Sequence, residues 1–340
     1  MNSPGQSCPL HYRYSPTLFS GPASQVEETV YIVGGLYCNP EALRTIQRMR
    51  DEELRAGRRV SLVFNGDFNW FNVDTSGFRL LNETVLGHIA IKGNVEAEIG
   101  APSGSGCGCN YPDYVDAATV DRSNALMTSL QSVAAGMPDI CCALDALPLA
   151  LTIQIGEARV GVVHGDAESL AGWSFAQEQL VAGNACASGE SSSSVLTPVE
   201  TIAEFFRAAK VCAFASTHTC LPIAKDYMVD GQARLIINNG AAGMPNFAGT
   251  TYGVITRIAV DRTLPSNSLY GIDLGGVRFD AIPVHYDQTA WIKRFLANWP
   301  AGSPAYESYL DRIRMGPRFQ VSDAVSGRVA LARARQSAQI

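Results

Sequence analysis

The chain has 340 residues, of which 46% are hydrophobic and 17% are charged, and its formal net charge is −6. This composition is typical of a folded globular protein and excludes an intrinsically disordered chain. An acidic chain has no basic surface to hold a phosphate backbone, so nucleic acid is not an expected partner.

The sequence also indicates where the protein works. No apolar run reaches the roughly 18 residues that cross a bilayer, so we expect no membrane contact. The first residues lack the basic start and apolar stretch of a secretory signal. We therefore predict a cytoplasmic protein whose nine cysteines are reduced thiols. The oligomeric state is left open.

The chain divides into three predicted parts. Residues 1–28 are rich in Pro, Ser and Tyr without any period, which indicates an arm draped over the fold or a disordered segment. Residues 29–290 form the main domain, in which the small polar residues 184–196 are expected to be a mobile loop. Residues 291–340 form a helical extension, and the arginines of 328–335 indicate a solvated helix at its end.

Strands and helices alternate through the main domain. Val30–Val33 is a short apolar strand, and Asn39 with Pro40 then starts a helix that Gly57 ends. Val60–Phe64 is a continuous apolar run, the pattern of a strand covered on both faces. Later helices are predicted over about 78–88, 119–135 and 197–210, and later strands over 89–92, 151–155, 159–163, 211–214 and 235–237. This alternation predicts a layered sheet with helices on both faces.

Polar turns follow the predicted strands. Asp67, Asn94, His164 and His218 each come directly after an apolar strand. Ligands of open α/β sheets bind outside the carboxyl ends of the strands, so we expect these four side chains in one pocket. Each residue also has an ordinary interpretation. Asn-Gly-Asp and Gly-Asn are common turn formers, and a lone histidine after a strand is often a hydrogen-bonded core residue.

The order of these turns resembles the motifs of the calcineurin-like metallophosphoesterase superfamily, in its small bacterial phosphodiesterase-like branch. The similar segments, between about Val30 and Tyr252, are Gly66-Asp67, Gly93-Asn94-Val95-Glu96, Val163-His164-Gly165, Phe214-Ala215-Ser216-Thr217-His218 and Asn239-Gly240-Ala241-Ala242-Gly243-Met244-Pro245. The resemblance implies a four-layer α/β/β/α sandwich, with two mixed sheets flanked by helices. It also implies a pair of metal ions about 3.5–4 Å apart that share one carboxylate.

Several family ligands are replaced in this chain. Gly35 and Tyr37 stand where the family has the Asp and His of its first motif, and Val95 stands where it has a histidine beside the phosphate. The resemblance makes Asp67 the bridging carboxylate. It assigns Asn94 and His164 to the metal that survives and His218 to the other one. Since one carboxylate holds two adjacent ions poorly, we expect a single divalent ion, Zn²⁺, Mn²⁺ or Fe²⁺.

Three functional hypotheses follow from the sequence. The first is a metallophosphoesterase-like hydrolase that acts on a small-molecule phosphoester or a related substrate. The second is a catalytically inactive relative that binds a ligand or a protein partner. The third is a different metal or thiol chemistry that uses Cys38, which we take as a further candidate metal ligand because its loop is expected to face the pocket.

Overall fold

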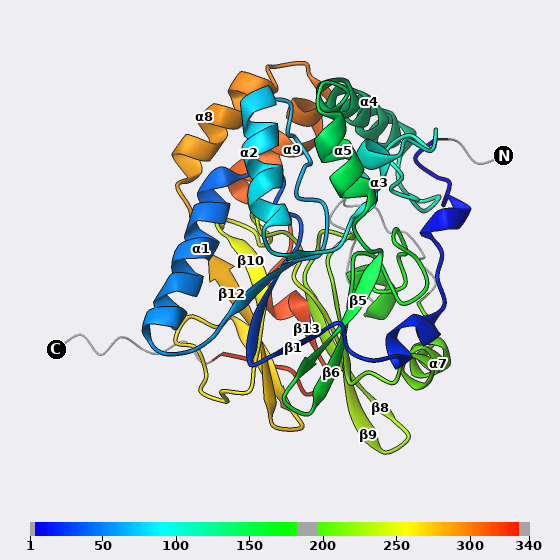
Figure 1. Ribbon diagram of the computed structural model, residues 1–340, viewed down its shortest axis with the longest axis vertical. Helices are drawn as coiled ribbons and strands as arrows, with labels where there is room; N and C mark the ends of the chain where they lie inside the picture. Colours follow the sequence, from blue (N-terminus) through cyan, green and yellow to red (C-terminus); the bar gives the residue numbers. More distant parts are fainter. Residues whose placement is uncertain (1–3, 182–195, 333–340) are drawn as a thin grey trace.

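The structure is a computed structural model that describes residues 4–181 and 196–332. Two β-sheets pack face to face, and helices cover their outer faces (Figure 1). The predicted four-layer α/β/β/α sandwich is therefore confirmed. Within the described residues, no helix is both long enough and apolar enough to cross a membrane.

Each sheet has seven strands within the described residues. The first sheet, in spatial order, consists of β14 (Ala330–Leu331), β11 (Tyr270–Leu274), β12 (Val277–Val284), β10 (Gly253–Ala259), β2 (Thr29–Val33), β3 (Ser61–Phe64) and β4 (Ile89–Ala90). The second consists of β1 (Gln25–Glu27), β5 (Ala150–Ile155), β6 (Ala158–Val163), β7 (Ala213–Ser216), β9 (Gln232–Asn238), β8 (Ile223–Val229) and β13 (Val325–Ser326).

Parallel strands lie beside one another in each sheet. In the first sheet β2, β3 and β4 are parallel, and in the second β6, β7 and β9 are parallel. Asn65, which directly follows β3, joins the two groups, because its Nδ2 donates a hydrogen bond to the carbonyl of Val163 at the end of β6 (3.0 Å). The carboxyl ends of both groups therefore meet at one edge of the sandwich.

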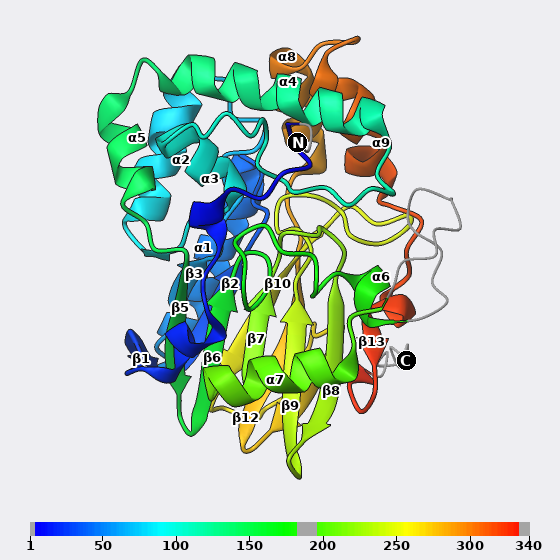
Figure 2. The same cartoon turned by 90° about the vertical axis from the view of Figure 1, so that its right-hand side faces the viewer.

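Helices cover this edge and the outer faces, as Figures 1 and 2 show. They are α1 (Pro40–Arg55), α2 (Thr75–Leu86), α3 (Asn94–Gly100), α4 (Ala117–Ala134), α5 (Pro138–Asp145), α6 (Gln177–Leu180), α7 (Val199–Ala209), α8 (Gln288–Asn298) and α9 (Pro304–Met315). The predicted start of α1 is confirmed, since the Asn39 side chain accepts hydrogen bonds from the first amides of the helix. In Figure 2, α7 crosses the outer face of the second sheet.

The core follows the two-residue period of the strands. Val30 and Ile32 of β2 pack between the sheets against Val160 and Val162 of β6. The alternate residue Tyr31 faces the helices of the first sheet instead. A continuous apolar run is needed because both faces of these strands are covered.

Short elements form both ends of the described chain. Residues 4–28 contain two short 3₁₀-helices, η1 (Leu10–Tyr12) and η2 (Pro16–Ser20), and the edge strand β1. Near the other end, η3 (Val321–Ala324) and β13 precede β14. The helix predicted over 328–335 is wrong for the described residues 328–332, because β14 pairs with β11. The predicted loop 184–196 lies outside the described residues, apart from Leu196.

A buried ion pair ties α1 to the first sheet. The Arg257 guanidinium on β10 donates to Glu53 on α1 (Nε to Oε1, 2.8 Å), and the Arg257 side chain is only 4% exposed. The Tyr31 hydroxyl donates to the same carboxylate at 2.9 Å. Burial acts to raise the pKa of Glu53, but hydrogen bonds from Arg257, Arg58 and Tyr31 outweigh it and lower that pKa below its usual value.

We expect Arg257→Met to lower the free energy of unfolding by about 3–5 kcal/mol, because it leaves the buried Glu53 carboxylate without its main partner. Urea denaturation at pH 7 measures this loss. The control Arg262→Met removes an exposed pair with Asp273 and should cost about 0–1 kcal/mol.

The same pair should respond to pH. The folded-state pKa of Glu53 lies below its unfolded value of about 4.3, so its contribution is present above that value and disappears as pH falls through the folded pKa. The stability difference between the parent chain and Arg257→Met should therefore shrink below about pH 4. Equal losses of unfolding free energy for Arg257→Met and Arg262→Met at pH 7 would contradict the stabilising role of the buried Arg257–Glu53 pair.

Candidate functional site

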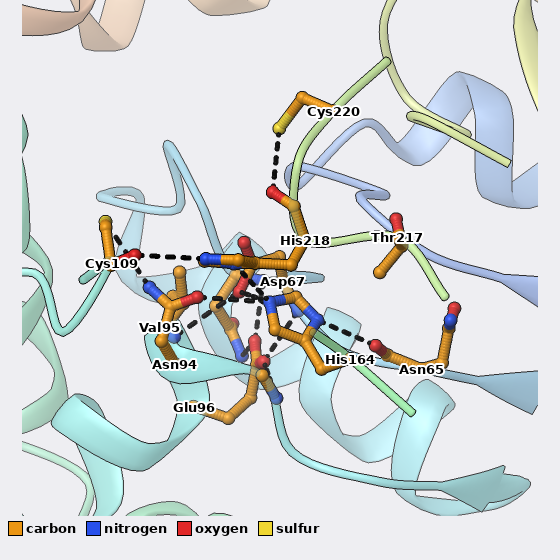
Figure 3. A network of polar contacts seen from close by, with 12 residues as sticks. Asn65, Asp67, Asn94, Val95, Glu96, Cys109, His164, Thr217, His218 and Cys220 are labelled. Carbon is orange, nitrogen blue, oxygen red and sulfur yellow. Dashed lines mark hydrogen bonds and ion pairs between the residues drawn. The ribbon is translucent and has the colours of Figure 1, made fainter. Parts of the chain in front are cut away.

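Four side chains that are far apart in sequence meet where the two sheets join (Figure 3). Asp67 follows β3, and Asn94 is the first residue of α3, just beyond β4. His164 follows β6, and His218 follows β7 by two residues. All four residues are at most 7% exposed. The first sheet therefore supplies the carboxylate and the amide, and the second supplies both imidazoles.

His164 Nε2 lies at the centre of this group. It is 3.1 Å from Asn94 Oδ1, 3.1 Å from His218 Nδ1 and 3.3 Å from Asp67 Oδ1. One ligand atom from each of Asp67, His164 and His218 can be chosen so that all three lie within 4.8 Å of one another. Separations of about 3 Å are those of atoms that share an ion at about 2.0–2.2 Å.

The surrounding hydrogen bonds fix which ring nitrogens carry protons. His164 Nδ1 lies 2.8 Å from the carbonyl oxygen of Asn65, and His218 Nε2 lies 3.0 Å from that of Cys109. A carbonyl can only accept, so these two nitrogens donate, and in the neutral rings the other nitrogens carry lone pairs. Asn94 Nδ2 donates to the carbonyl of Cys107 at 2.8 Å, which directs Asn94 Oδ1 toward the histidines.

The result is a group of four acceptor atoms that face one another with no donor among them: Asp67 Oδ1, Asn94 Oδ1, His164 Nε2 and His218 Nδ1. Buried acceptors without a donor are costly unless a cation joins them. A proton on His164 Nε2 could be shared with only one neighbour at a time. A metal ion contacts all four at once, so the residues present fit a cation.

The electrostatics of the group agree with this geometry. Burial acts to raise the pKa of Asp67, but His164, His218 and the Val95 amide outweigh it and lower that pKa. Burial acts to lower the pKa of His164, yet the Asp67 carboxylate outweighs burial and raises it. Burial and the neighbouring His164 together lower the pKa of His218 to about 3. The site thus favours one positive charge between these groups.

Glu96 supports the site from behind, a role that the sequence analysis missed. Its carboxylate accepts hydrogen bonds from the backbone amides of Asp67 (2.8 Å), Gly93 (3.0 Å) and Asn69 (3.1 Å). It thereby holds the turn after β3 against the start of α3. Burial and the Asp67 carboxylate raise the pKa of Glu96 to about 7.

Two glycines allow these turns to approach one another. A Cβ on Gly93 would lie 2.4 Å from Asp67 Oδ1, and one on Gly66 would lie 2.5 Å from His164 Nδ1. Gly66 also has a φ of +99°, a conformation that side-chain-bearing residues rarely adopt. The glycines of both motifs are therefore required by close packing beneath the four side chains.

Strained backbone gathers around the site. Five non-glycine residues here have positive φ: Tyr37 (52°), Cys38 (57°), Asp67 (54°), Phe71 (73°) and Cys220 (62°). Such conformations cost of the order of 1–3 kcal/mol each and concentrate at functional sites. The Tyr37 hydroxyl and the Cys220 thiol are hydrogen-bonded at 2.7 Å, so the strained turns touch one another.

Cys38 does not join the four side chains, in contrast to the expectation that it faces the pocket. Its thiol donates to Asn72 Oδ1 at 2.9 Å, and it lines a different cavity together with Leu43 and Arg294. Burial raises the pKa of this thiol to about 12, so the thiolate that binds metal is disfavoured. We therefore leave Cys38 out of the ligand set.

The loop that carries Cys107 and Cys109 orients two of the four side chains. Its carbonyls accept from Asn94 and from His218, as described above, and the Cys109 carbonyl also accepts from Trp173 Nε1 (3.1 Å). The sulfur atoms of Cys107 and Cys109 lie next to each other, so these two of the nine cysteines, all expected to be reduced, are placed where a disulfide could form.

The group opens into a cavity of about 430 Å³. Its lining residues are Tyr37, Asp67, Trp70, Asn94, Val95, Cys109, Tyr111, Tyr114, Val115, Asp116, Thr119, Trp173, Gln177, Glu178, His218, Thr219, Cys220, Leu221, Tyr309 and Arg312. Val95 offers this cavity only an apolar side chain, while its amide donates to Asp67 Oδ1 at 3.3 Å. The cavity therefore receives no side-chain hydrogen-bond donor from this position.

We expect Gly93→Ala to lower the free energy of unfolding by about 1–3 kcal/mol, because the added methyl group meets the Asp67 carboxylate and backbone. The control Gly136→Ala has its nearest neighbour 3.6 Å from the new Cβ and should change stability by less than about 0.5 kcal/mol. Urea denaturation measures both, and a neutral Gly93→Ala would contradict the close packing.

Comparison with known proteins gives a likeness of fold. The sequence matches no protein-family model and no curated protein. Over 86% of its length the chain resembles a hypothetical protein from Pyrococcus horikoshii, covering 100% of that chain with 14% identity and a TM-score of 0.54. A metallophosphoesterase from Sphaerobacter thermophilus also matches, with 16% identity, coverage of 82% and 97%, and a TM-score of 0.46. At identities this low, the likeness is one of fold alone.

Proposed function

We propose that Asp67, Asn94, His164 and His218 bind one divalent metal ion, and that the chain hydrolyses a small-molecule phosphoester with it. The convergence of four buried acceptor atoms, none of which can donate to the others while both rings are neutral, carries this proposal. Two imidazoles, an amide oxygen and a carboxylate are suitable ligands for Zn²⁺, Mn²⁺ or Fe²⁺. With four protein ligands, an ion that accepts five or six leaves positions open for substrate.

A divalent ion in this place would supply charge neutralisation at a phosphoryl group and an activated water. The residues of the chain then have separate tasks. Arg312 lines the cavity and can neutralise a phosphoryl oxygen, while Trp173 restricts the entry of water beside His218. Neither Val95 nor the strongly buried Tyr37 offers an acid near neutral pH, since burial and the neighbouring Cys220 hold the pKa of Tyr37 well above its usual range.

The inactive, ligand-binding relative remains the second candidate. The observation that favours it is Val95, which lies in the cavity where the family has a histidine. Measurements of both metal content and turnover separate the two candidates, because a binding protein takes up its ligand without hydrolysing it. A chemistry based on Cys38 loses its support because the thiol is held by Asn72.

The purified chain should bind about one ion per molecule, since a single carboxylate serves the site. Elemental analysis after dialysis against Mn²⁺ or Zn²⁺ measures this content. His218→Ala should weaken metal binding by at least about tenfold. Losing a residue that only supports the metal ligands already weakens binding by about that factor. The control His285→Ala changes an exposed histidine outside the site and should bind normally. Two tightly held ions per chain would contradict the reduced site.

Turnover of p-nitrophenyl phosphate and of its bis-ester should be weak. A positioned acid usually contributes about 10²–10⁴-fold, and this chain has none at Val95. Assays with added Mn²⁺, Zn²⁺ and Fe²⁺ should show low activity that disappears in Asp67→Ala and increases in Val95→His. Robust activity in the parent chain would overturn the argument from the missing histidine, and metal binding without any turnover would favour the binding protein.

A further inference from the structure

Aromatic side chains form much of the cavity wall above the four acceptor atoms. They are Tyr37, Trp70, Tyr111, Tyr114, Trp173 and Tyr309. The rings of Tyr111 and Trp173 lie 5.9 Å apart, and those of Trp70 and Tyr309 lie 6.5 Å apart. Trp173 also packs edge-on against the His218 ring at 5.4 Å, so the aromatic wall starts beside the candidate ligands.

Two carboxylates other than Asp67 line the same cavity as these aromatic rings. Asp116 and Glu178 both line the cavity, and the Tyr114 hydroxyl donates to Glu178 Oε1 at 3.1 Å. Asp116 caps α4, where hydrogen bonds from the Thr119 side chain and amide lower its pKa, so it is charged at neutral pH. One part of the cavity therefore combines aromatic rings with negative charge.

The opposite charge enters the cavity from another element. Arg312, on α9, is the one arginine or lysine among the lining residues in the described part of the chain. Its guanidinium donates to the carbonyl of Cys220, two residues after His218, at 2.6 Å, and to that of Pro245 at 3.4 Å. The positive group is thus anchored beside the turn that carries His218, and the carboxylates belong to α6 and the start of α4.

Gln177 adds an unused donor to the cavity. The residue is 3% exposed and lines the cavity, and its Nε2 has no hydrogen-bond partner within residues 4–181 and 196–332. A buried donor without a partner is rare in folded proteins. An acceptor oxygen on a bound molecule would satisfy it.

We propose that the cavity takes a zwitterionic phosphoester that carries an organic ammonium group, an inference that rests on the function proposed above. The phosphoryl group would lie toward the four acceptor atoms, with Arg312 and Gln177 as its further partners. The ammonium group would lie against the aromatic rings, whose faces attract cations, near Asp116 and Glu178. Two carboxylates in the cavity oppose a substrate with a second phosphate.

Phosphocholine and its neutral isostere 3,3-dimethylbutyl phosphate test this proposal, because they differ only in the charge of the terminal group. Titration calorimetry on the full chain with Mn²⁺ should show phosphocholine binding about tenfold more tightly. Asp116→Asn keeps the helix cap and Glu178→Gln keeps the acceptor for Tyr114, so each removes charge alone. Each should reduce this preference severalfold, because only phosphocholine loses an attraction to the removed charge.

The control is Asp113→Asn, which removes an exposed carboxylate of the same loop outside the cavity lining and should keep the full preference. Equal binding of the two ligands, binding of neither, or tighter binding of adenosine 5′-phosphate would overturn the zwitterionic substrate.

Repeating the titrations after treatment with a chelator separates this inference from the metal-dependent function. A preference for phosphocholine that persists in a chain without metal supports the ammonium site, even if the hydrolase proposal fails. Stoichiometric metal binding together with equal affinity for both ligands overturns the ammonium site and leaves the metal proposal standing.

Discussion

The site of this protein depends on one electrostatic constraint, the burial of three acceptor atoms around a fourth, His164 Nε2. While both rings are neutral such a group has no donor of its own, which a cation would supply, and it keeps its geometry only if the remaining donors have other partners. The carbonyls of Asn65, Cys107 and Cys109 provide those partners. The hydrogen bonds behind the site therefore matter as much as the four side chains, because they decide which atoms face the centre.

The two-sheet fold makes this arrangement possible. Parallel strands of both sheets end at the same edge, and the Asn65 side chain holds the two edges together. Several features of this edge are energetically unfavourable. They are the positive φ of Asp67, the close contacts of Gly66 and Gly93, and the buried carboxylate of Glu96. Costs of this kind persist where function requires the geometry. They agree with a site that is built for binding rather than for stability.

Several positions that the motif resemblance singled out offer nothing to the group of acceptors. Gly35 and Val95 carry no polar side chain, and Tyr37 turns its hydroxyl to Cys220. What remains is one group of acceptors at the base of a cavity whose walls are aromatic. In the proposed function, the positive charge beside a phosphoryl group would come from Arg312, which lies outside all the motifs and reaches the cavity from α9.

The sequence by itself determined the strands from Val30 to Ile237 except β8, the layered class and the positions of the polar turns, because burial and turn chemistry are local and leave a period. It could not place Cys38 correctly, since the direction of a thiol depends on its neighbour Asn72. It also could not find Glu96, Gln177 or Arg312 as parts of the site. Their roles come from contacts between elements distant in sequence, and only tertiary packing decides which carboxylate is buried behind a turn and which faces a ligand.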